Sequence, residues 1–489
     1  MTLSPADYKH YVDSFNAIDV PEDVVNLIPN ADAFDWMSRN VPLLDCPDKA
    51  LEKIYYYRWW TFRKHIKQTP AGIIVTEFIT PVSHAGSYNS ISCATSLHLA
   101  EGRWIRDQRV LDEYTRFWFR SKNGKPEEKF HKFSSWIASA MFDRYHVNGD
   151  RAFLLDLLPD LISDYEAWVA EKQLPSGLFW QFDVRDGMEE SISGSRKHQN
   201  ARPTINSYMY ANALAIATIA DMAGKADVAN SYRGKAAELK KLMQETLWDE
   251  KTKFFKAQTE GGPQLSDARE AIGFIPWMFN LPDRGYEEAW NELVCPDGFW
   301  APFGITTAER RHPKFRSHGV GHCEWDGAVW PFATSQTLYA LANVLRHYDQ
   351  PYVTKHHYFE AINIYVKSQH WGEKPYIGEY LDEKTGAWLK GDNPRSRFYN
   401  HSTFCDLVIT GLIGLVPRAD DTIELSPLLP PGAWDYFCLD NVLYHGRKLT
   451  ITWDRTGEGY TRGAGLSIAV DGEEIARSPQ LQALTTKMP

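Results

Sequence analysis

The sequence predicts a mainly α-helical protein, in which helical hairpins close into a ring, followed by a small antiparallel β module. Between about residues 49 and 415, apolar residues recur every three or four positions, which is the period of an amphipathic helix. After Pro417 the pattern changes to short alternating runs separated by Pro, Gly and Asp, which is typical of antiparallel strands. The change of period predicts a domain boundary near residue 418.

The helical part contains roughly a dozen predicted helices. Asp150 and Thr204 are N-cap candidates, because a short polar side chain can accept a hydrogen bond from a free backbone N–H group. Gly224 separates two helical segments and is expected to end the first of them. The strongest helical patterns cover residues 51–66, 127–147, 151–173, 204–224, 225–248 and 327–348.

A weak internal repeat predicts how the helices are arranged. Residues 247–255 read LWDEKTKFF and residues 380–388 read YLDEKTGAW, each expected to form a tight turn between short strands at the end of a helix. Two copies of the same turn indicate repeated helical hairpins that close into a ring. Chance similarity of a four-residue turn is the alternative.

The chain therefore divides into three predicted parts. Residues 1–45 form an N-terminal extension, residues 46–418 form the helical domain, and residues 419–489 form a C-terminal β-sandwich-like module.

The charge balance excludes one class of partner. The 489 residues include 53 Lys and Arg against 63 Asp and Glu, a net charge of −10, and no local basic block stands out. A nucleic-acid surface needs clustered Lys and Arg to neutralise phosphates. We therefore expect no nucleic-acid partner.

Neither a membrane anchor nor an export signal is expected. No run approaches the roughly 20 apolar residues of a membrane span, and the first residues lack a charged segment followed by an apolar core. The six cysteines are far apart and form no C-x-x-C pair. These features predict a cytoplasmic protein with reduced thiols, without membrane contact and without a metal site.

Aromatic residues indicate the class of ligand. They make up 13 % of the chain, with 18 Trp, and many lie beside Asp, Glu, Gly and Asn in irregular segments. Sugar rings stack their apolar C–H faces on aromatic rings while polar groups read the hydroxyls. Carbohydrate is therefore the expected substrate class, although tryptophans that merely fill the core are the alternative.

The strongest candidate site lies in residues 174–203, one of three long irregular connections. Its central segment, WQFDVRDGMEESISGSR, combines clustered carboxylates with a basic residue and aromatic rings on a glycine-bearing loop. A solvated acidic loop is the alternative, but such loops rarely carry so many aromatics. The candidates here are Trp180, Asp183, Arg185, Asp186 and Glu189.

A second carboxylate comes from the connection 370–400. Glu379 lies between Gly378 and Tyr380, close to Tyr376, on the way into the second D-E-K-T turn. A lone glutamate is usually a surface charge. Glycosidic cleavage, however, needs two carboxyl groups, one protonated to serve the leaving oxygen and one ionised to activate water or attack.

The third connection, 296–326, leads into a helix through HGVGHCEWDGAVWPF. Trp325, Asp326 and Trp330 are expected to form a sugar-binding wall near the helix start, where backbone N–H groups are free. The neighbouring His322 and Cys323 are weak candidates for a metal or thiol site, because catalytic partners meet in space rather than in sequence. Tyr208, at the start of another helix, is a further candidate for substrate contact.

At these residues the sequence resembles the six-hairpin α/α-toroid glycoside hydrolases, in particular glycoside hydrolase family 63 and the mannosylglycerate-hydrolase-like domain. The segment 187–191, GMEES, occupies the place of the family's acid loop. The segments 379–386, EYLDEKTG, and 325–331, WDGAVWP, match its base motif and its W-R-G-P-x-W-P motif in the same order.

The resemblance implies an (α/α)6 barrel and an exo-acting, inverting glycosidase without a cofactor, with Glu189 as general acid and Glu379 as general base. Two departures matter. The acid position carries Glu where Asp is usual, so Asp186 or Asp183 remains an alternative acid. Asp326 replaces the usual arginine and changes the charge beside the substrate.

Three rival functions remain open. A sugar epimerase or polysaccharide lyase would use His or Tyr bases, a phosphorylase would replace the base by phosphate, and a carbohydrate-binding protein would not turn its ligand over. If the mechanism is inverting, the two carboxyl groups should lie about 6.5–9.5 Å apart. The sugar, its anomer, its linkage and the oligomeric state are not determined by the sequence.

Overall fold

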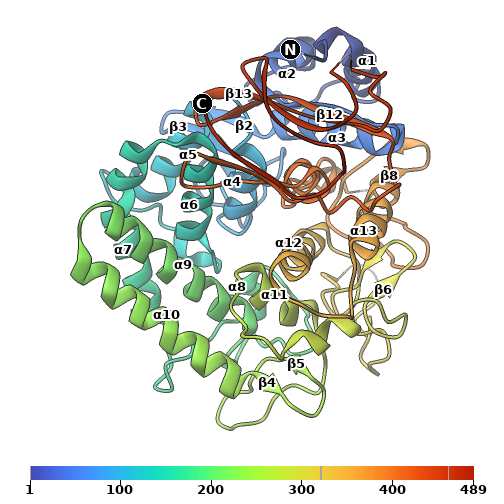
Figure 1. Ribbon diagram of the computed structural model, residues 1–489. Coiled ribbons are helices and arrows are strands. Elements are labelled where there is room, and N and C mark those ends of the chain that lie inside the picture. Colours follow the sequence, from blue (N-terminus) through green and yellow to red (C-terminus); the bar gives the residue numbers. More distant parts are fainter. Residues whose placement is uncertain (1, 320–321, 392, 461) are drawn as a thin grey trace.

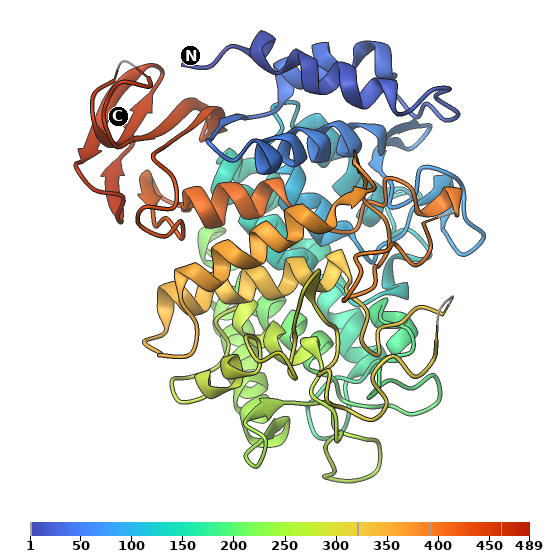
Figure 2. The ribbon, with the colours of Figure 1, turned by 90° about the vertical axis from the view of Figure 1, so that its right-hand side faces the viewer.

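The structure of the protein, a computed structural model, describes residues 2–319, 322–391, 393–460 and 462–489. A body of helices makes up most of it, and a β-sheet module lies beside one end of these helices (Figures 1 and 2). In Figure 2 the long irregular connections gather at the opposite end. The predicted fold class, mainly helical with a C-terminal antiparallel sheet, is confirmed.

Within the described residues, six helical elements contact one another in sequence order, and the last contacts the first, so they close a ring. Two of them, α9 and α12, are buried on nearly all sides, which explains their mixture of apolar and small residues without a polar stripe. The ring consists of α4 (Thr95–Gly102), α6 (Ile137–Asn148), α9 (Pro203–Met222), α11 (Ile275–Met278), α12 (Pro331–His347) and α14 (Cys405–Leu407).

A second set of helices lies outside this ring (Figure 1). Of these, α10 keeps polar residues on its outer face and packs apolar residues against α9. These helices are α3 (Lys49–Lys64), α5 (Arg109–Arg120), α7 (Arg151–Lys172), α10 (Ala226–Thr246) and α13 (Lys355–Ser368). Two further helices, α1 (Lys9–Ala17) and α2 (Ala33–Asn40), pack on α3.

Five of the six strongest helical predictions agree with the structure within a few residues. The prediction for 127–147 is wrong over its first ten residues, since α6 begins only at Ile137. The preceding segment is fixed instead by the connection 174–203: the Ser134 N–H group donates to the Arg185 carbonyl. This long-range hydrogen bond keeps the segment out of the helix although its apolar spacing suits one.

The predicted helix ends are partly correct. Asp150 caps α7 by accepting the N–H group of Phe153 at 3.0 Å, and Gly224 follows α9 with φ of +71°. Thr204 is not an N-cap, because α9 begins one residue earlier at Pro203 and the Thr204 hydroxyl donates to a carboxylate.

Both D-E-K-T segments form the same turn. Asp249 accepts the Lys251 N–H group, and Asp382 accepts the Lys384 N–H group, each at 3.0 Å. In both turns the threonine hydroxyl donates to the same aspartate. The first turn joins β4 (Trp248–Asp249) to β5 (Phe254–Phe255), as predicted. The second is closed by a single bridge between Leu381 and Trp388.

The C-terminal module holds an antiparallel sheet in the order β1-β12-β13-β14-β15. Its first strand was not expected: Leu43, from the N-terminal extension, pairs with Asp440. The pairing joins the two ends of the chain, which local sequence patterns do not reveal. The strands are β1 (Leu43–Asp45), β12 (Tyr436–Tyr444), β13 (Arg447–Asp454), β14 (Gly465–Val470) and β15 (Glu473–Ser478).

Shorter strands complete the fold. A three-stranded sheet contains β10 (Leu415–Val416), β11 (Thr422–Leu425) and β16 (Leu484–Lys487). Hairpins are formed by β2 (Ile66–Thr69) with β3 (Gly72–Val75), β6 (Trp300–Ala301) with β7 (Gly304–Ile305), and β8 (His370–Trp371) with β9 (Lys374–Pro375). Among the described residues, no helix has the length and apolar character needed to cross a bilayer.

Candidate active site

The connection 174–203 is shaped by a one-turn helix, α8 (Asp183–Asp186), which ends at Gly187. Gly187 has φ of +70°, a conformation that side chains disfavour. A Cβ atom there would also clash with the Cys93 thiol, at the entrance to α4. Glycine therefore lets the chain turn sharply against α4 and present the next residues, Met188 and Glu189.

Asp186 anchors this loop from inside. Its carboxylate accepts hydrogen bonds from Arg202 Nε and Ser134 Oγ, both at 2.7 Å, and from the Thr204 hydroxyl. The side chains of Asp186 and Arg202 are both 0 % exposed. Asp186, predicted as a substrate contact and left open as the acid, thus has its oxygens occupied by protein groups and ties the loop to the start of α9.

Asp183 braces the same loop. It is buried, and Oδ2 accepts the N–H group of Glu190 at 3.3 Å. Burial raises the pKa of Asp183, although the charge of Arg202 opposes the shift. The negative charge of Asp183 also raises the pKa of the neighbouring Glu189.

Glu189 has the properties that a general acid needs. Burial raises the pKa of Glu189 to about 7, and the negative charges of Asp183 and Glu379 act in the same direction, whereas Lys390 opposes them. A carboxyl group with this pKa keeps its proton over a wider pH range than a free glutamate. Of the three candidate acids, Glu189 is the one whose surroundings favour the protonated form without occupying both oxygens.

Glu379 lies near Glu189 and has the opposite electrostatic setting. Its side chain is 4 % exposed, and it pairs with Lys390 Nζ at 3.0 Å and with an Arg395 nitrogen at 3.2 Å. Two cations beside one buried carboxylate offset its negative charge. The negative charge of Glu379 acts on Glu189. The fold therefore places these two carboxyl groups, which are 190 residues apart in the chain, in one site.

A buried aromatic stack lies beside Glu379. Trp330 lies parallel to Trp325, with ring centroids 4.5 Å apart, and parallel to Tyr380 on its other side at 4.6 Å. Lys390 Nζ lies 5.3 Å from the centre of the Tyr380 ring, next to Glu379. The structure thus brings together three of the predicted aromatic residues and the predicted base.

Asp326 joins two connections at the rim. Its buried carboxylate lies 2.8 Å from His318 Nδ1, and the other ring nitrogen of His318 lies 3.6 Å from Glu190. Asp326 was predicted to contact the substrate. In the structure its carboxylate instead orients His318, which reaches the acid loop.

The other predicted contacts lie elsewhere. Tyr208 is 2 % exposed inside the helix ring, where its hydroxyl accepts a hydrogen bond from Gln336 at 2.6 Å. Trp180 lies beneath Lys172, with the ammonium 3.9 Å from the ring centre. Tyr376 packs beside Trp388 at 5.3 Å.

Arg185 contributes through its backbone carbonyl, which fixes Ser134. Three residues of the site were not predicted: Glu77, Lys390 and Arg395. They carry no recognisable motif, and only their position in the tertiary structure marks them.

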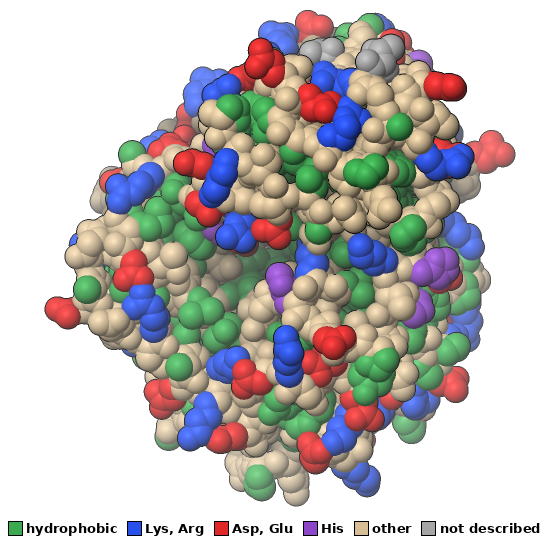
Figure 3. Space-filling model, in the orientation of Figure 1, with side chains coloured by type: hydrophobic (Ala, Val, Ile, Leu, Met, Phe, Trp, Pro, Cys, Tyr) green, Lys and Arg blue, Asp and Glu red, His purple; other side chains and the backbone are tan. Residues whose placement is uncertain are grey.

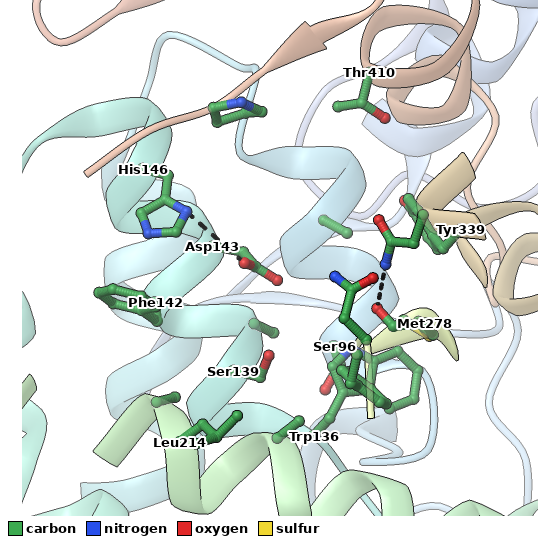
Figure 4. Close-up of a pocket in the computed structure, with 18 of the residues that line it drawn as sticks. Ser96, Trp136, Ser139, Phe142, Asp143, His146, Leu214, Met278, Tyr339 and Thr410 are labelled. Carbon is green, nitrogen blue, oxygen red and sulfur yellow. Dashed lines mark hydrogen bonds and ion pairs between the residues drawn. The ribbon is translucent and has the colours of Figure 1, made fainter. Parts of the chain in front are cut away.

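A separate cavity of about 350 Å³ lies at the other end of the ring (Figure 4). It is lined by residues of several ring helices, including His146 near the C-terminal end of α6 and Tyr339 in the middle of α12, whereas the acid and base loops precede the N-termini of ring helices. Figure 3 shows this face hollowed near its centre. Trp136 and Phe279 of this lining pack against Tyr208.

Comparison with known proteins agrees with this geometry. A family model described as the mannosylglycerate hydrolase MGH1-like glycoside hydrolase domain matches residues 87–402, more than half of the chain. The chain belongs to this family. The resemblance inferred from the three motifs is thereby confirmed. A second model, the C-terminal domain of glycosyl hydrolase family 65, matches residues 417–477 and thus most of the β module.

Several known proteins are similar to this MGH1-like chain. A solved structure named sialidase is 52 % identical, with a TM-score of 0.97 over 99 % of this chain. The family 63 mannosylglycerate hydrolase from Thermus thermophilus in complex with glucose is 11 % identical; the match covers 75 % of this chain and 99 % of that chain with a TM-score of 0.54. An uncharacterised protein of Borreliella burgdorferi is 22 % identical over 218 residues, 43 % of this chain.

The chain spans 44 % of the sialidase chain and 44 % of the Borreliella protein. In both relatives, more than half of the sequence lies outside the part that matches this chain. The Thermus similarity is a similarity of fold.

Proposed function

We propose that the protein is an exo-acting, inverting glycosidase in which Glu189 is the general acid and Glu379 the general base. The observation that carries this proposal is the opposite electrostatic setting of two neighbouring carboxyl groups. Burial and negative neighbours favour the protonated form of Glu189, while Lys390 and Arg395 pair with Glu379. Glycosidic cleavage by inversion needs this division of roles.

In the proposed reaction, Glu189 donates its proton to the glycosidic oxygen as the bond to the anomeric carbon breaks. Glu379 accepts a proton from a water molecule, whose oxygen attacks the anomeric carbon from the opposite face. The departing alcohol carries the proton from Glu189, and the sugar is released with inverted configuration. No covalent intermediate is involved.

The closed ring supports exo action. Because the rings of Trp136, Tyr208 and Phe279 pack together inside the helix ring, we propose that a polysaccharide does not thread through it. A terminal sugar can enter from the end where the connections gather. The buried Trp325–Trp330–Tyr380 stack lies beside the base and supports that end of the site.

We also propose a six-hairpin (α/α)6 barrel for the helical body and retain the boundaries 46–418 and 419–489. The closed chain of contacts among α4, α6, α9, α11, α12 and α14, with helices outside it, supports the barrel. The pairing of β1 with β12 attaches the extension 1–45 to the β module.

The test is sugar release from a panel of α- and β-linked disaccharides, nitrophenyl glycosides, pectic oligosaccharides, glycosyl glycerates and sialosides. The last two classes are included because of the names of the similar proteins. Glu189→Gln and Glu379→Gln should each lose at least about 10³-fold in kcat/KM with the fold intact. NMR of the first product should show the inverted anomer.

The matched control is Glu190→Gln, since Glu190 lies on the same loop but pairs with Arg196 near the surface. Activity that survives either Glu189→Gln or Glu379→Gln contradicts the assignment of roles. Turnover that depends on added phosphate would identify a phosphorylase instead.

A further inference from the structure

A third carboxyl group, Glu77, lies behind the base. Glu77 follows β3 and is 5 % exposed. Its backbone carbonyl accepts the N–H group of Asn400 at 3.0 Å, and its Oε1 accepts a hydrogen bond from the Tyr399 hydroxyl. The hairpin β2–β3 thereby delivers a carboxyl group to the segment that ends the base connection, 370–400.

Tyr399 continues this contact toward Glu379. The Tyr399 N–H group donates to the carbonyl of Ile377, two residues before the base, at 3.3 Å. Its ring lies 4.6 Å from Phe78, between centroids, and the Arg395 guanidinium lies 5.4 Å from the centre of the same Phe78 ring. Arg395 pairs with Glu379, so one continuous set of contacts runs from Glu77 to the base.

The charge setting of Glu77 agrees with this position. Burial raises the pKa of Glu77 to about 8, with further contributions from the charges of Glu379 and Glu189, while Tyr399 and Arg395 oppose the shift. Its other oxygen, Oε2, is buried and has no hydrogen-bond partner in the described part of the chain. The titratable and charged groups that act on or with Glu77 are Glu189, Glu379, Arg395, Lys132, Cys93, Tyr114 and Tyr399.

We propose that Glu77 is a positioning residue of the glycosidase site, acting through Tyr399 on the segment that carries Glu379 and by its charge on Glu189. The inference rests on the proposed function. Nothing in the motifs of the chain points to Glu77, and only the folded chain places it between the acid loop and the base loop.

The kinetic test compares wild type with Glu77→Gln, Tyr399→Phe and the double variant. Gln keeps the shape and can still accept the Tyr399 hydroxyl, so the fold should survive, which thermal unfolding checks. We expect kcat to fall by about tenfold or more with KM little changed, and the two losses to be non-additive in the double variant.

The pH profile gives a readout that a merely structural role would not move. Above about pH 8, ionised Glu77 disfavours ionisation of Glu189 and so raises the pKa of that acid. This ionisation slows the loss of the Glu189 proton above pH 8 in wild type, so the fall in kcat/KM above pH 8 should be steeper in Glu77→Gln, while the start of the alkaline limb near pH 7 should stay in place. The acid limb should stay, because Glu77 is protonated there in wild type.

The matched control is Glu52→Gln. Glu52 is also a buried glutamate that accepts a tyrosine hydroxyl, from Tyr11 at 3.0 Å, but it lies in α3 against the N-terminal extension. Glu52→Gln should leave kcat and the pH profile unchanged. Wild-type kcat together with a wild-type slope of the pH profile above pH 8 in Glu77→Gln would overturn the proposal.

A second measurement does not depend on turnover. The infrared carbonyl band of a protonated carboxyl group, absent in Glu77→Gln, should disappear in wild type as the pH rises through about 8. In Glu379→Gln the band should disappear at lower pH, since a neighbouring negative charge has been removed, whereas Glu52→Gln should not move it. If wild type cleaves no glycoside, the proposed function fails, but the shift of the band in Glu379→Gln still tests whether Glu77 interacts with Glu379. A band that does not move in Glu379→Gln would overturn the proposed position of Glu77.

Discussion

Lys390 Nζ lies 3.0 Å from Oε2 of Glu379. The same ammonium lies 3.3 Å from the Cys323 thiol and 5.3 Å above the Tyr380 ring, so it is surrounded by groups of the site. Because the pair is largely buried, its attraction is little screened by solvent. Lys390 therefore neutralises part of the charge that Glu189, Glu379 and Asp183 concentrate in the pocket.

Replacing Lys390 by Met should lower kcat/KM by about tenfold or more, because a buried carboxylate loses one of its two cations. Thermal stability should change much less than activity. Steady-state kinetics of Lys390→Met beside Lys384→Met test this. Lys384 lies in the same connection with a 69 % exposed side chain, and its variant should behave as wild type. Equal kinetics in the two variants would remove Lys390 from the site.

Activity should fall as the pH rises through about 7, since the proposed acid works only while Glu189 keeps its proton. The charge of Asp183 raises the pKa of Glu189, so Asp183→Asn should move the alkaline limb of kcat/KM to lower pH. Asp221→Asn, at the far end of α9, serves as the control. A limb that stays in place in Asp183→Asn would exclude this electrostatic coupling.

Arg202→Met should destabilise the protein by about 3–5 kcal/mol, because it leaves the buried Asp186 carboxylate without its cation. The fully buried pair cannot be replaced by solvent. Denaturant unfolding of Arg202→Met and Arg196→Met gives the comparison. Arg196 pairs with Glu190 at the surface, where loss of the pair costs about 1 kcal/mol or less. Similar losses in the two variants would contradict the anchoring role of Asp186.

Gly187→Ala should reduce both stability and activity, since the new Cβ meets the Cys93 thiol and pushes the acid loop away from α4. Gly224→Ala isolates the other contribution: Gly224 has nearly the same φ, +71° against +70°, with open space around it. Gly224→Ala should lower the free energy of unfolding only by the conformational cost of about 1–2 kcal/mol, and it should keep its activity. Adding Cys93→Ala to Gly187→Ala should restore part of the lost activity; no recovery would refute the steric cause.

Helix predictions succeeded where the deciding forces are local. In residues 151–173 the apolar spacing and the Asp150 cap act within a few turns, and the structure has α7 at Arg151–Lys172. They failed at 127–136, where Ser134 is held by a loop about 50 residues later in the chain. The strand β1 escaped prediction for the same reason, because its partner lies at the other end of the chain.

The sequence by itself determined the helical body, the C-terminal strands, the three connections that carry the site, and the two glutamates of the proposed mechanism. All of these follow from the period of apolar residues and from short motifs. The tertiary structure decided which acid is free, since Asp186 is occupied by Arg202 and Glu189 is not. It also added Glu77, Lys390 and Arg395. Protonation and ion pairing depend on burial and on neighbours distant in the chain, so these roles exist only once the connections meet in space.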